Sequence, residues 1–335
     1  MNDAHRNAPS QRPCAPSRRL RTTALLLLAG AMIGINVSAA HADGSGGRQH
    51  GSRCHRRPHV PGMVVTESRQ DFDDTWAALI GALDDNPSIT VVATVDHAAA
   101  AAGAGLDLEP NRVVVFGNPA LGTPIMEVGR TAGLDLPQKI LVWEDRQRVF
   151  VGYNSVDYLA ARHDVGDADT LETIAGALSG LAATATGDER NCESRWRHDR
   201  VLRRVARRPG VVTVASDADF DTTWSRLLAA IEGSPASVAF TVDHGANAAG
   251  VLEPTRLVVF GNPNLGTPLM QRSPTAGIDL PIKILVWEDA NGVTQVSTTD
   301  VRFLKRRHRL QHVRESLDAI DGAIDNFVTA ATSTT

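Results

Sequence analysis

The sequence predicts an α+β protein made of two copies of one domain, each a mostly antiparallel sheet with helices on one face. Three observations predict this fold class. Two long strings of residues recur along the chain, strand-like segments alternate with amphipathic helices in each copy, and 335 residues suit two domains of ordinary size. The order of elements in each copy is β-α-β…β-β-α, which is typical of helices packed on one side of a sheet.

The repeat is the strongest signal in the chain. Residues 116–126 read FGNPALGTPIM and residues 260–270 read FGNPNLGTPLM, with nine of eleven positions identical. Residues 131–145 and 275–289 read TAGLDLPQKILVWED and TAGIDLPIKILVWED, with thirteen of fifteen identical. A period of roughly 147 residues is too long for a solenoid unit and suits a whole domain. Two such copies in one chain can pack as a pseudo-twofold pair, as the subunits of a homodimer do.

The first half of each copy predicts a strand followed by an amphipathic helix. Residues 63–68 (MVVTES) are rich in β-branched side chains and predict the first strand. Phe72, Trp76, Leu79, Ile80 and Leu83 then recur with helical spacing, so they form one apolar helix face. Asp71 precedes this helix and is expected to cap its N-terminus.

The second half of each copy predicts further strands, short helices and a closing helix. Strands are expected over 89–95, 112–116, 139–144 and 150–153, short helices over 97–104 and 121–128, and closing helices over 170–185 and 313–330. The strand over 139–144 has an unbroken apolar middle, which favours a central position in the sheet. Asn291-Gly292 in the second copy predicts a type I′ hairpin, and the first copy needs a different turn there.

The pattern divides the chain into five segments. A positive n-region precedes an apolar run at residues 24–35, and Ala40-His41-Ala42 fits a cleavage site, so we expect an export signal. Twelve apolar residues are too few to span a bilayer, so we expect no stable membrane insertion and a periplasmic or secreted protein. The expected segments are a signal peptide at 1–42, a disordered His/Arg/Gly-rich segment at 43–60, repeat domains at 61–186 and 209–332, and a basic linker at 187–208.

Charge and cysteine positions narrow the classes of partner. The net charge is −4, but residues 190–208 hold eight arginines against Glu193 and Asp199. Acidic domains joined by one basic segment do not match a nucleic-acid-binding protein, whose basic residues line a folded face. We therefore expect no nucleic-acid partner and a solvated linker helix. Cys54 and Cys192 each precede a domain copy, so an exported chain could join them in a disulfide, with free thiols or an intermolecular bridge as alternatives.

The recurring strings resemble the family called "domain of unknown function 302". The resemblance rests on Phe-Gly-Asn-Pro, Gly-Thr-Pro, Asp-Leu-Pro and Lys-Ile-Leu-Val-Trp-Glu-Asp, which occur in both copies and cover most of residues 61–165 and 209–310. It implies a small α+β domain of TBP-like architecture that often pairs with a second copy. It implies no reaction.

Two repeated dipeptides are candidates for chemistry. Asp96-His97 and Asp243-His244 end a strand and open a helix, where a carboxylate beside an imidazole can act as a general base or the imidazole can bind a metal. Helix capping by the aspartate explains the same pattern and is the favoured interpretation. No structural zinc spacing is present, so the histidines are only weak candidates for a metal.

A loop and a strand end supply the remaining candidates. Asn118 and Asn262 follow a strand in a glycine-containing loop, whose backbone N–H groups could hold an anion, although a plain turn is the favoured interpretation. The sequence also offers candidates for paired carboxylates, namely Asp135, Glu144 and Asp145 and their repeats Asp279, Glu288 and Asp289. Lys139 and Lys283 are two of only three lysines in the chain, and an ion pair at a strand edge is their favoured role.

These observations favour a non-catalytic module that binds a small ligand or a protein. Its pockets are expected at the loops that hold Asp96, His97 and Asn118 and at the equivalent loops of the second copy. A hydrolase that uses Asp-His with Glu144 or Glu288 is one alternative, and metal or haem handling through the repeated histidines is another. No cofactor is predicted, because no P-loop, dinucleotide-binding, haem-attachment or zinc-protease motif occurs.

Overall fold

A computed structural model of the chain describes residues 58–188 and 195–333. All of these residues belong to one compact unit, which contains both repeats. The expected signal peptide, Cys54 and Cys192 lie outside the described residues.

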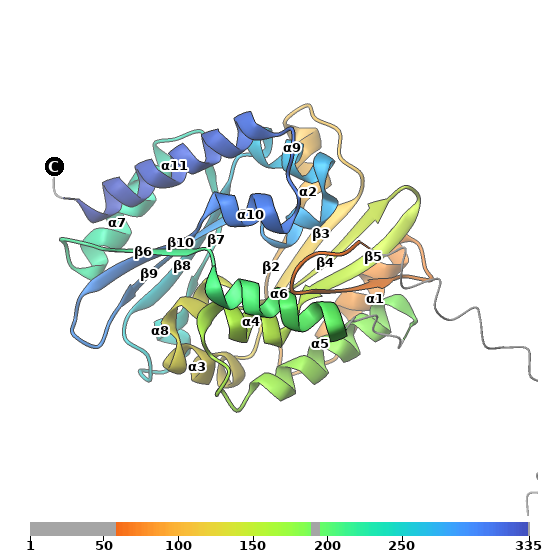
Figure 1. The fold of residues 1–335 in the computed structure, drawn as a ribbon, viewed down its shortest axis with the longest axis horizontal. Helices are drawn as coiled ribbons and strands as arrows, with labels where there is room; N and C mark the ends of the chain where they lie inside the picture. Colours follow the sequence, from red (N-terminus) through yellow and green to blue (C-terminus); the bar gives the residue numbers. More distant parts are fainter. Residues whose placement is uncertain (1–57, 189–194, 334–335) are drawn as a thin grey trace, which may run out of the picture. The chain divides into compact units, whose positions relative to one another are not determined.

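The first repeat forms a five-stranded sheet with helices (Figure 1). The sheet order is β1-β5-β4-β3-β2, and every neighbouring pair of strands is antiparallel. β4 is therefore central, as its apolar sequence predicts. The elements are β1 (Met63–Glu67), α1 (Phe72–Asp84), β2 (Thr90–Asp96), α2 (His97–Gly103), β3 (Asn111–Gly117), α3 (Pro119–Val128), the 3₁₀ helix η2 (Arg130–Leu134), β4 (Gln138–Asp145), β5 (Arg148–Asn154), α4 (Val156–His163) and α5 (Leu171–Thr186).

The second repeat copies this plan with the sheet order β6-β10-β9-β8-β7. The α+β class and the antiparallel sheets predicted from the sequence are confirmed in both copies. The elements are β6 (Val211–Ala215), α7 (Phe220–Glu232), β7 (Ser237–Asp243), α8 (His244–Asn247), β8 (Thr255–Gly261), α9 (Pro263–Arg272), the 3₁₀ helix η3 (Pro274–Ile278), β9 (Ile282–Glu288), β10 (Thr294–Thr299), α10 (Val301–Arg307) and α11 (Arg314–Thr332).

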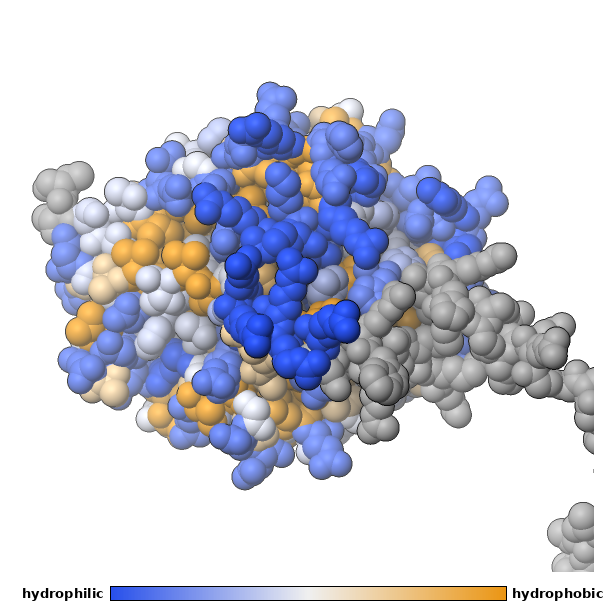
Figure 2. Space-filling view, in the orientation of Figure 1, coloured by the Kyte–Doolittle hydropathy of each residue, from blue (hydrophilic) through white to orange (hydrophobic). Residues whose placement is uncertain are grey.

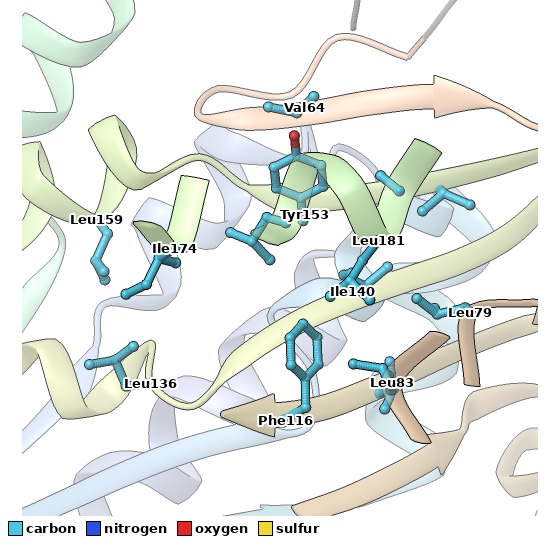
Figure 3. Packing of buried hydrophobic residues seen from close by; sticks show 14 of the residues in the cluster. Val64, Leu79, Leu83, Phe116, Leu136, Ile140, Tyr153, Leu159, Ile174 and Leu181 are labelled. Atoms are coloured by element: carbon cyan, nitrogen blue, oxygen red, sulfur yellow. The ribbon is translucent and has the colours of Figure 1, made fainter. Parts of the chain in front are cut away.

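One face of each sheet packs against helices and forms a hydrophobic core. In the first repeat, Leu79 and Leu83 from α1, Leu181 from α5 and Ile140 from β4 meet in this core (Figure 3). α1 begins at the predicted N-cap, because the Asp71 carboxylate accepts a hydrogen bond from the Asp74 N–H at 2.9 Å. Side chains alternate along a strand, so the neighbours of Ile140 on β4 point to the opposite face.

The opposite face of each sheet packs against the other repeat. Ile278 of η3 joins the cluster on the first sheet that includes Leu141 and Trp143. Leu134 of η2 joins the equivalent cluster on the second sheet, which includes Leu257 and Leu285. Each repeat therefore inserts its 3₁₀ helix into the face of the other sheet, and both insertions bury a fully enclosed aliphatic side chain.

The basic segment between the repeats contains helix α6 (Arg195–Arg207). It lies next to α4 and buries Val205 in the core of the second repeat, so the helix is docked and is not fully solvated. Its arginines Arg200, Arg203 and Arg204 are exposed. Figure 2 shows a strongly hydrophilic surface in the region of α6 and α10.

The two hairpin turns are the reverse of the prediction, because the type I′ turn occurs in the first repeat and not in the second. Arg146 and Gln147 in the first repeat both have positive φ, 53° and 63°, as a type I′ turn requires. In the hairpin of the second repeat Gly292 has positive φ but Asn291 does not, so Asn291-Gly292 does not form the predicted type I′ turn. The reason is local: the Asp289 carboxylate accepts hydrogen bonds from the N–H groups of Asn291 and Val293 and stabilises a different loop.

Candidate binding pockets between the repeats

Two equivalent pockets lie at the ends of the sheets where the Phe-Gly-Asn-Pro strings stand. The larger has a volume of about 280 Å³ and the smaller about 180 Å³. We call them the Asn262 pocket and the Asn118 pocket after the loop that each contains. In each, the walls come from the edge strand, the Asn-Pro loop, the Leu-Pro segment and the closing helix of one repeat. The other repeat contributes the start of its Asp-His helix: His97 and Ala100 in the Asn262 pocket, His244 and Asn247 in the Asn118 pocket.

The Asn-Pro loop owes its shape to a helix cap. The Asn118 side chain accepts a hydrogen bond from the Ala120 N–H at 2.9 Å, and Pro119 occupies the first turn of α3. Asn262 makes the same contact with the Asn264 N–H at 3.0 Å. These interactions end the strand and begin the helix at the pocket wall. The plain-turn interpretation of this loop is thus correct for its backbone, and the loop also lines a pocket.

The repeated histidines lie at the boundary between the repeats. His97 is 4% exposed, and its Nε2 lies 3.2 Å from the Gly277 carbonyl oxygen. His244 is equally buried, with its Nε2 3.3 Å from the Gly133 carbonyl oxygen. Because a carbonyl can only accept, Nε2 carries the proton in both. Burial lowers the pKa of each imidazole to about 4, although the hydrogen bond to the carbonyl opposes this shift.

The aspartates beside these histidines act as helix caps. The Asp96 carboxylate accepts a hydrogen bond from the Ala99 N–H at 2.8 Å and forms an ion pair with Arg112 at 2.7 Å. Asp243 makes the equivalent contacts with Ala246 and Arg256. Neither aspartate hydrogen-bonds to the neighbouring imidazole, so the carboxylate–imidazole pair that a general base needs is not assembled.

Glu144 and Glu288 lie at the far ends of their strands. Glu144 lies near the end of β4, where its N–H donates to the Pro110 carbonyl. The Asn118 pocket lies at the other end of β4, which begins at Gln138, a residue of the pocket wall. Six residues of strand place these ends about 20 Å apart. Neither glutamate lines either pocket, so Asp-His and Glu do not converge as a hydrolase site would require. The Asn and His candidates do converge, but they come from different repeats.

Both pockets are mainly apolar, with a few polar groups. The Asn262 pocket includes Phe260, Leu265, Ile320 and Phe327 in its wall. The Thr267 hydroxyl in this wall is buried and has no hydrogen-bond partner among the described residues. An apolar pocket with a few polar groups is the usual character of a small-molecule site.

The edge strands explain why the pockets differ in volume. Thr90 and Ser237 occupy equivalent positions, since each pairs with the glycine that ends the neighbouring strand. The residues beside them are large in the first repeat and small in the second. Ile89 and Val92 line the Asn118 pocket, while alanines line the Asn262 pocket at the corresponding positions, Ala236 and Ala239.

A buried ionic cluster links the two repeats, and its arginine–aspartate pairs were not predicted from the sequence. Asp135 accepts from Arg162 at 2.7 Å and lies 2.9 Å from His163 Nε2. Arg162 also crosses to the second repeat, donating to the Thr299 hydroxyl at 2.8 Å and to the Pro209 carbonyl at 3.1 Å. Arg162-His163 recurs in the sequence as Arg307-His308, but the aspartate that pairs with Arg162 lies 27 residues earlier in the chain.

The second repeat contributes the equivalent cluster. Arg307 donates to Asp279 at 2.7 Å, to Asn154 at 2.5 Å and to the Pro61 carbonyl at 3.0 Å. Burial raises the pKa of Asp279, but Arg307 and the His308 hydrogen bond outweigh it and hold that pKa well below its usual range. Both aspartates are therefore charged, and each arginine ties the two repeats together.

Lys139 and Lys283 belong to this interior and not to a strand edge. Lys139 Nζ lies 3.5 Å from Asp135 Oδ1, and Lys283 donates to the Asp279 carbonyl at 3.0 Å. Their strands are central, so the favoured strand-edge location is wrong although the ion pair with Asp135 exists. Among the described residues, no three His, Cys, Asp or Glu side chains are placed to hold a metal ion together.

The family model "Domain of unknown function DUF302" matches residues 64–181 and 212–327. The chain belongs to this family. The two DUF302 matches coincide with the two sheets, so the repeat seen in the sequence is a repeat of the whole DUF302 fold.

Curated relatives match one part of the chain. "Fluoride-specific ion channel FluC 1" of Brucella suis biovar 1 is 38% identical over 144 residues, which is 42% of this chain and 56% of that protein. The protein of the same name from Brucella abortus biovar 1 is also 38% identical, over 52% of its length. The chain thus spans about half the length of the curated relatives it matches. In the portion that the structure describes, no helix combines the length and apolar character needed to cross a membrane.

A solved structure that aligns with part of this chain is titled "Crystal structure of uncharacterized conserved protein DUF302 from Bacillus stearothermophilus". It is 15% identical, has a TM-score of 0.34, and aligns over 37% of this chain and 98% of that protein.

Proposed function

We propose that this tandem DUF302 protein is an exported, non-catalytic binding protein whose two pockets each hold a small, largely apolar ligand. The observation that carries the proposal is the pair of equivalent apolar pockets, each built around the repeated Asn-Pro loop and completed by the other repeat. An apolar cavity of about 150 Å³ is already large enough to bind benzene. Volumes of about 280 and 180 Å³ therefore suit molecules larger than a single ring.

Polar groups in the walls favour a ligand with a hydrogen-bonding group at one end. Ser237 and Asn262 line the Asn262 pocket, so their polar groups can offer a ligand a hydrogen bond. In the Asn118 pocket, Asn247 adds an amide where Ala100 stands in the other pocket, so that pocket suits a more polar ligand.

The state of the histidines supports binding over catalysis. A general base needs a free imidazole nitrogen within reach of substrate, and its pKa should lie near the working pH. In His97 and His244 the protonated Nε2 faces a carbonyl of the other repeat, and burial lowers the pKa to about 4. They are better suited to forming a pocket boundary than to moving protons.

Probe binding with pocket-filling variants tests the proposal. The fluorescence of N-phenyl-1-naphthylamine, a neutral apolar dye, should rise on binding with two sites per chain. Ala323→Phe fills the Asn262 pocket and Ala177→Phe fills the Asn118 pocket, since both alanines line the walls. Each variant should leave one site and the double variant none.

Ala330→Phe is the matched control, because Ala330 is an exposed residue of α11 outside the pocket wall. It should keep both sites. Two sites of unchanged affinity in the double variant would reject the pockets as ligand sites and would leave a protein-binding role.

Export is tested separately by fractionation. The predicted cleavage after Ala42 places the mature N-terminus at Asp43. Mass spectrometry of the chain expressed in its native host should find that terminus in the periplasmic or secreted fraction. Recovery of the chain from the cytoplasm with residues 1–42 retained would contradict export and leave the pocket proposal intact.

A further inference from the structure

The two sheets face each other across a small cavity that both buried lysines line. Lys139 lies on β4 opposite Val115, and Lys283 lies on β9 opposite Val259. Each lysine is 7% exposed. The remaining wall is apolar and includes Val113 and Leu257 from the facing sheets and two prolines that follow the 3₁₀ helices, Pro137 and Pro281.

The charges around this cavity do not balance. Each aspartate already forms a 2.7 Å ion pair with an arginine, Asp135 with Arg162 and Asp279 with Arg307. Burial lowers the pKa of His163 and of His308, so both imidazoles are neutral at pH 7. Lys139 shares Asp135 with Arg162, and no further carboxylate is left for Lys283 when it is protonated. Positive charge then exceeds negative charge in this interior, so a bound anion would have a clear physical benefit.

The ammonium groups also retain unused hydrogen-bond donors. When both lysines are protonated, they carry six N–H donors together. Within the described part of the chain, Lys283 has one hydrogen bond, to the Asp279 carbonyl, and Lys139 has one ion pair, at 3.5 Å from Asp135. The remaining donors are available to a ligand in the cavity that both lysines line.

We propose that Lys139 and Lys283 together bind one monatomic anion, of halide size, in the cavity between the two sheets. The volume of the cavity limits the ligand to a monatomic anion. Its volume is about 20 Å³, and a cavity needs roughly 10–15 Å³ to hold one water molecule. One atom of similar size to water fits, whereas sulfate, phosphate or a carboxylate ligand does not.

Near neutral pH, halide binding should be accompanied by the uptake of a proton by the protein. Burial and the nearby charge of Lys139 lower the pKa of Lys283 to about 7, and an adjacent anion favours the charged ammonium. The charged and titratable groups around Lys283 are Asp279, Arg307, His308 and Lys139, together with Asp135 and Arg162 of the first repeat. The arginines and aspartates keep their charge between pH 6 and 8, and burial lowers the pKa of His308 below its usual value, so Lys283 should dominate this proton uptake. Halide affinity should therefore be roughly tenfold higher at pH 6 than at pH 8.

Calorimetric titration of the full chain in halide-free buffer tests the site. Fluoride, chloride and bromide are the probes, with sulfate at matched ionic strength as the size control. We expect saturable binding of one halide per chain, proton uptake seen by comparing two buffers, and no binding of sulfate. Bromide-soaked crystals should show an anomalous peak between the two Nζ atoms.

Three methionine variants identify the ligands. Lys283→Met and Lys139→Met keep the aliphatic stem and should weaken halide binding at least tenfold, and the double variant should abolish it. Lys305→Met is the control and should bind normally, because Lys305 is the exposed third lysine. Equal heats for halide and sulfate, or unchanged halide binding in the double variant, would overturn the proposal. If a variant fails to fold, proton uptake and the bromide peak in the unmodified chain still decide it.

Discussion

The His97 imidazole of the first repeat hydrogen-bonds to the backbone carbonyl of Gly277 in the second, with 3.2 Å between the two atoms. His244 and Gly133 form the reciprocal contact at 3.3 Å. The repeated histidines, which were candidates for catalysis or metal binding, thus join the two DUF302 repeats. Their glycine partners sit on the 3₁₀ helices that insert into the opposite sheets.

Removing these imidazoles should destabilise the chain without abolishing the fold. His97→Ala leaves the Gly277 carbonyl buried and unpaired, which costs about 1–3 kcal/mol. The double variant with His244→Ala should lose about twice as much in urea unfolding, because the two contacts are separate. His97→Gln retains an N–H donor and should lose less. Variants as stable as the parent would show that these hydrogen bonds contribute nothing to pairing.

Alanine should be tolerated less well at Gly277 than at Gly133, although the two positions are equivalent. A Cβ at Gly277 would lie 2.5 Å from Asn111 Oδ1, whereas at Gly133 the nearest atom is Leu285 Cδ1 at 3.0 Å. Asn111 is held by its own hydrogen bond to the Pro274 carbonyl at 2.9 Å, so it cannot move freely. We expect a loss of about 1–3 kcal/mol for Gly277→Ala in chemical denaturation and a smaller loss for Gly133→Ala.

Gly322→Ala is the control for this comparison. Gly322 lies inside α11, and a Cβ there meets nothing within 4 Å. Alanine should stabilise the helix by about 0.5–1 kcal/mol. Equal losses at Gly277 and Gly133 would mean that the interface relaxes around the added methyl group.

Neutralising Asp279 should be among the most damaging single changes. Asp279→Asn leaves Arg307, which is 1% exposed, as a buried cation with a weakened partner. Breaking one partner of a buried ion pair costs about 3–5 kcal/mol. Calorimetric melting should show that loss, and Asp279→Asn combined with Arg307→Met should recover part of it. Asp318→Asn removes an exposed pair with Arg314 and should change stability by less than about 1 kcal/mol. Similar losses for Asp279→Asn and Asp318→Asn would argue against the cluster as a stabilising feature.

Stability should fall as the pH drops from about 6.5 to 4. His97 and His244 have pKa values of about 4 in the folded chain and near 6.5 when unfolded. Below pH 6.5 the unfolded chain therefore binds more protons, and acid favours unfolding. Each shift corresponds to at most about 3 kcal/mol, reached only below pH 4. In urea unfolding at a series of pH values, the His97→Gln/His244→Gln variant should have a flatter profile. A profile as steep as that of the parent would assign the dependence to other groups.

The edge-strand residues that make the Asn262 pocket larger should have the same effect when they are introduced into the Asn118 pocket. Ile89→Ala/Val92→Ala gives the Asn118 pocket the edge-strand residues of the Asn262 pocket. If both pockets of the unmodified chain bind the apolar dye with different affinities, the weaker affinity should rise toward the stronger one in this variant. Val91→Ala, at an exposed position on the same strand, is the control. An unchanged pair of affinities would mean that the edge strand does not shape ligand selection.

The regular elements of the fold could be predicted because their signals are local. The spacing of Phe72, Trp76 and Leu79 specifies the face of α1, and Asp71 caps that helix as predicted. The apolar middle of β4 likewise indicates a strand with neighbours on both sides. The turn at Asn291 was predicted wrongly, because the side chain of Asp289 decided its geometry.

The site was only partly predictable because its residues meet across the two repeats. His97 and Asn262 line one pocket although 165 residues separate them in the sequence. No local sequence pattern indicates which repeat contributes which residues to a pocket wall. Arg162 and Arg307 were visible as members of a repeated pair, but their partners are carbonyl groups and side chains of the other copy.

Joining both repeats in one chain has a consequence for how the pockets can evolve. In a dimer of identical subunits every mutation appears twice, so the two pockets must change together. Here Ile89 and Ala236 are encoded separately, and one pocket can narrow while the other stays wide. Because both repeats belong to one chain, the two pockets can change independently of each other. Each pocket still needs residues from the other repeat to complete its wall.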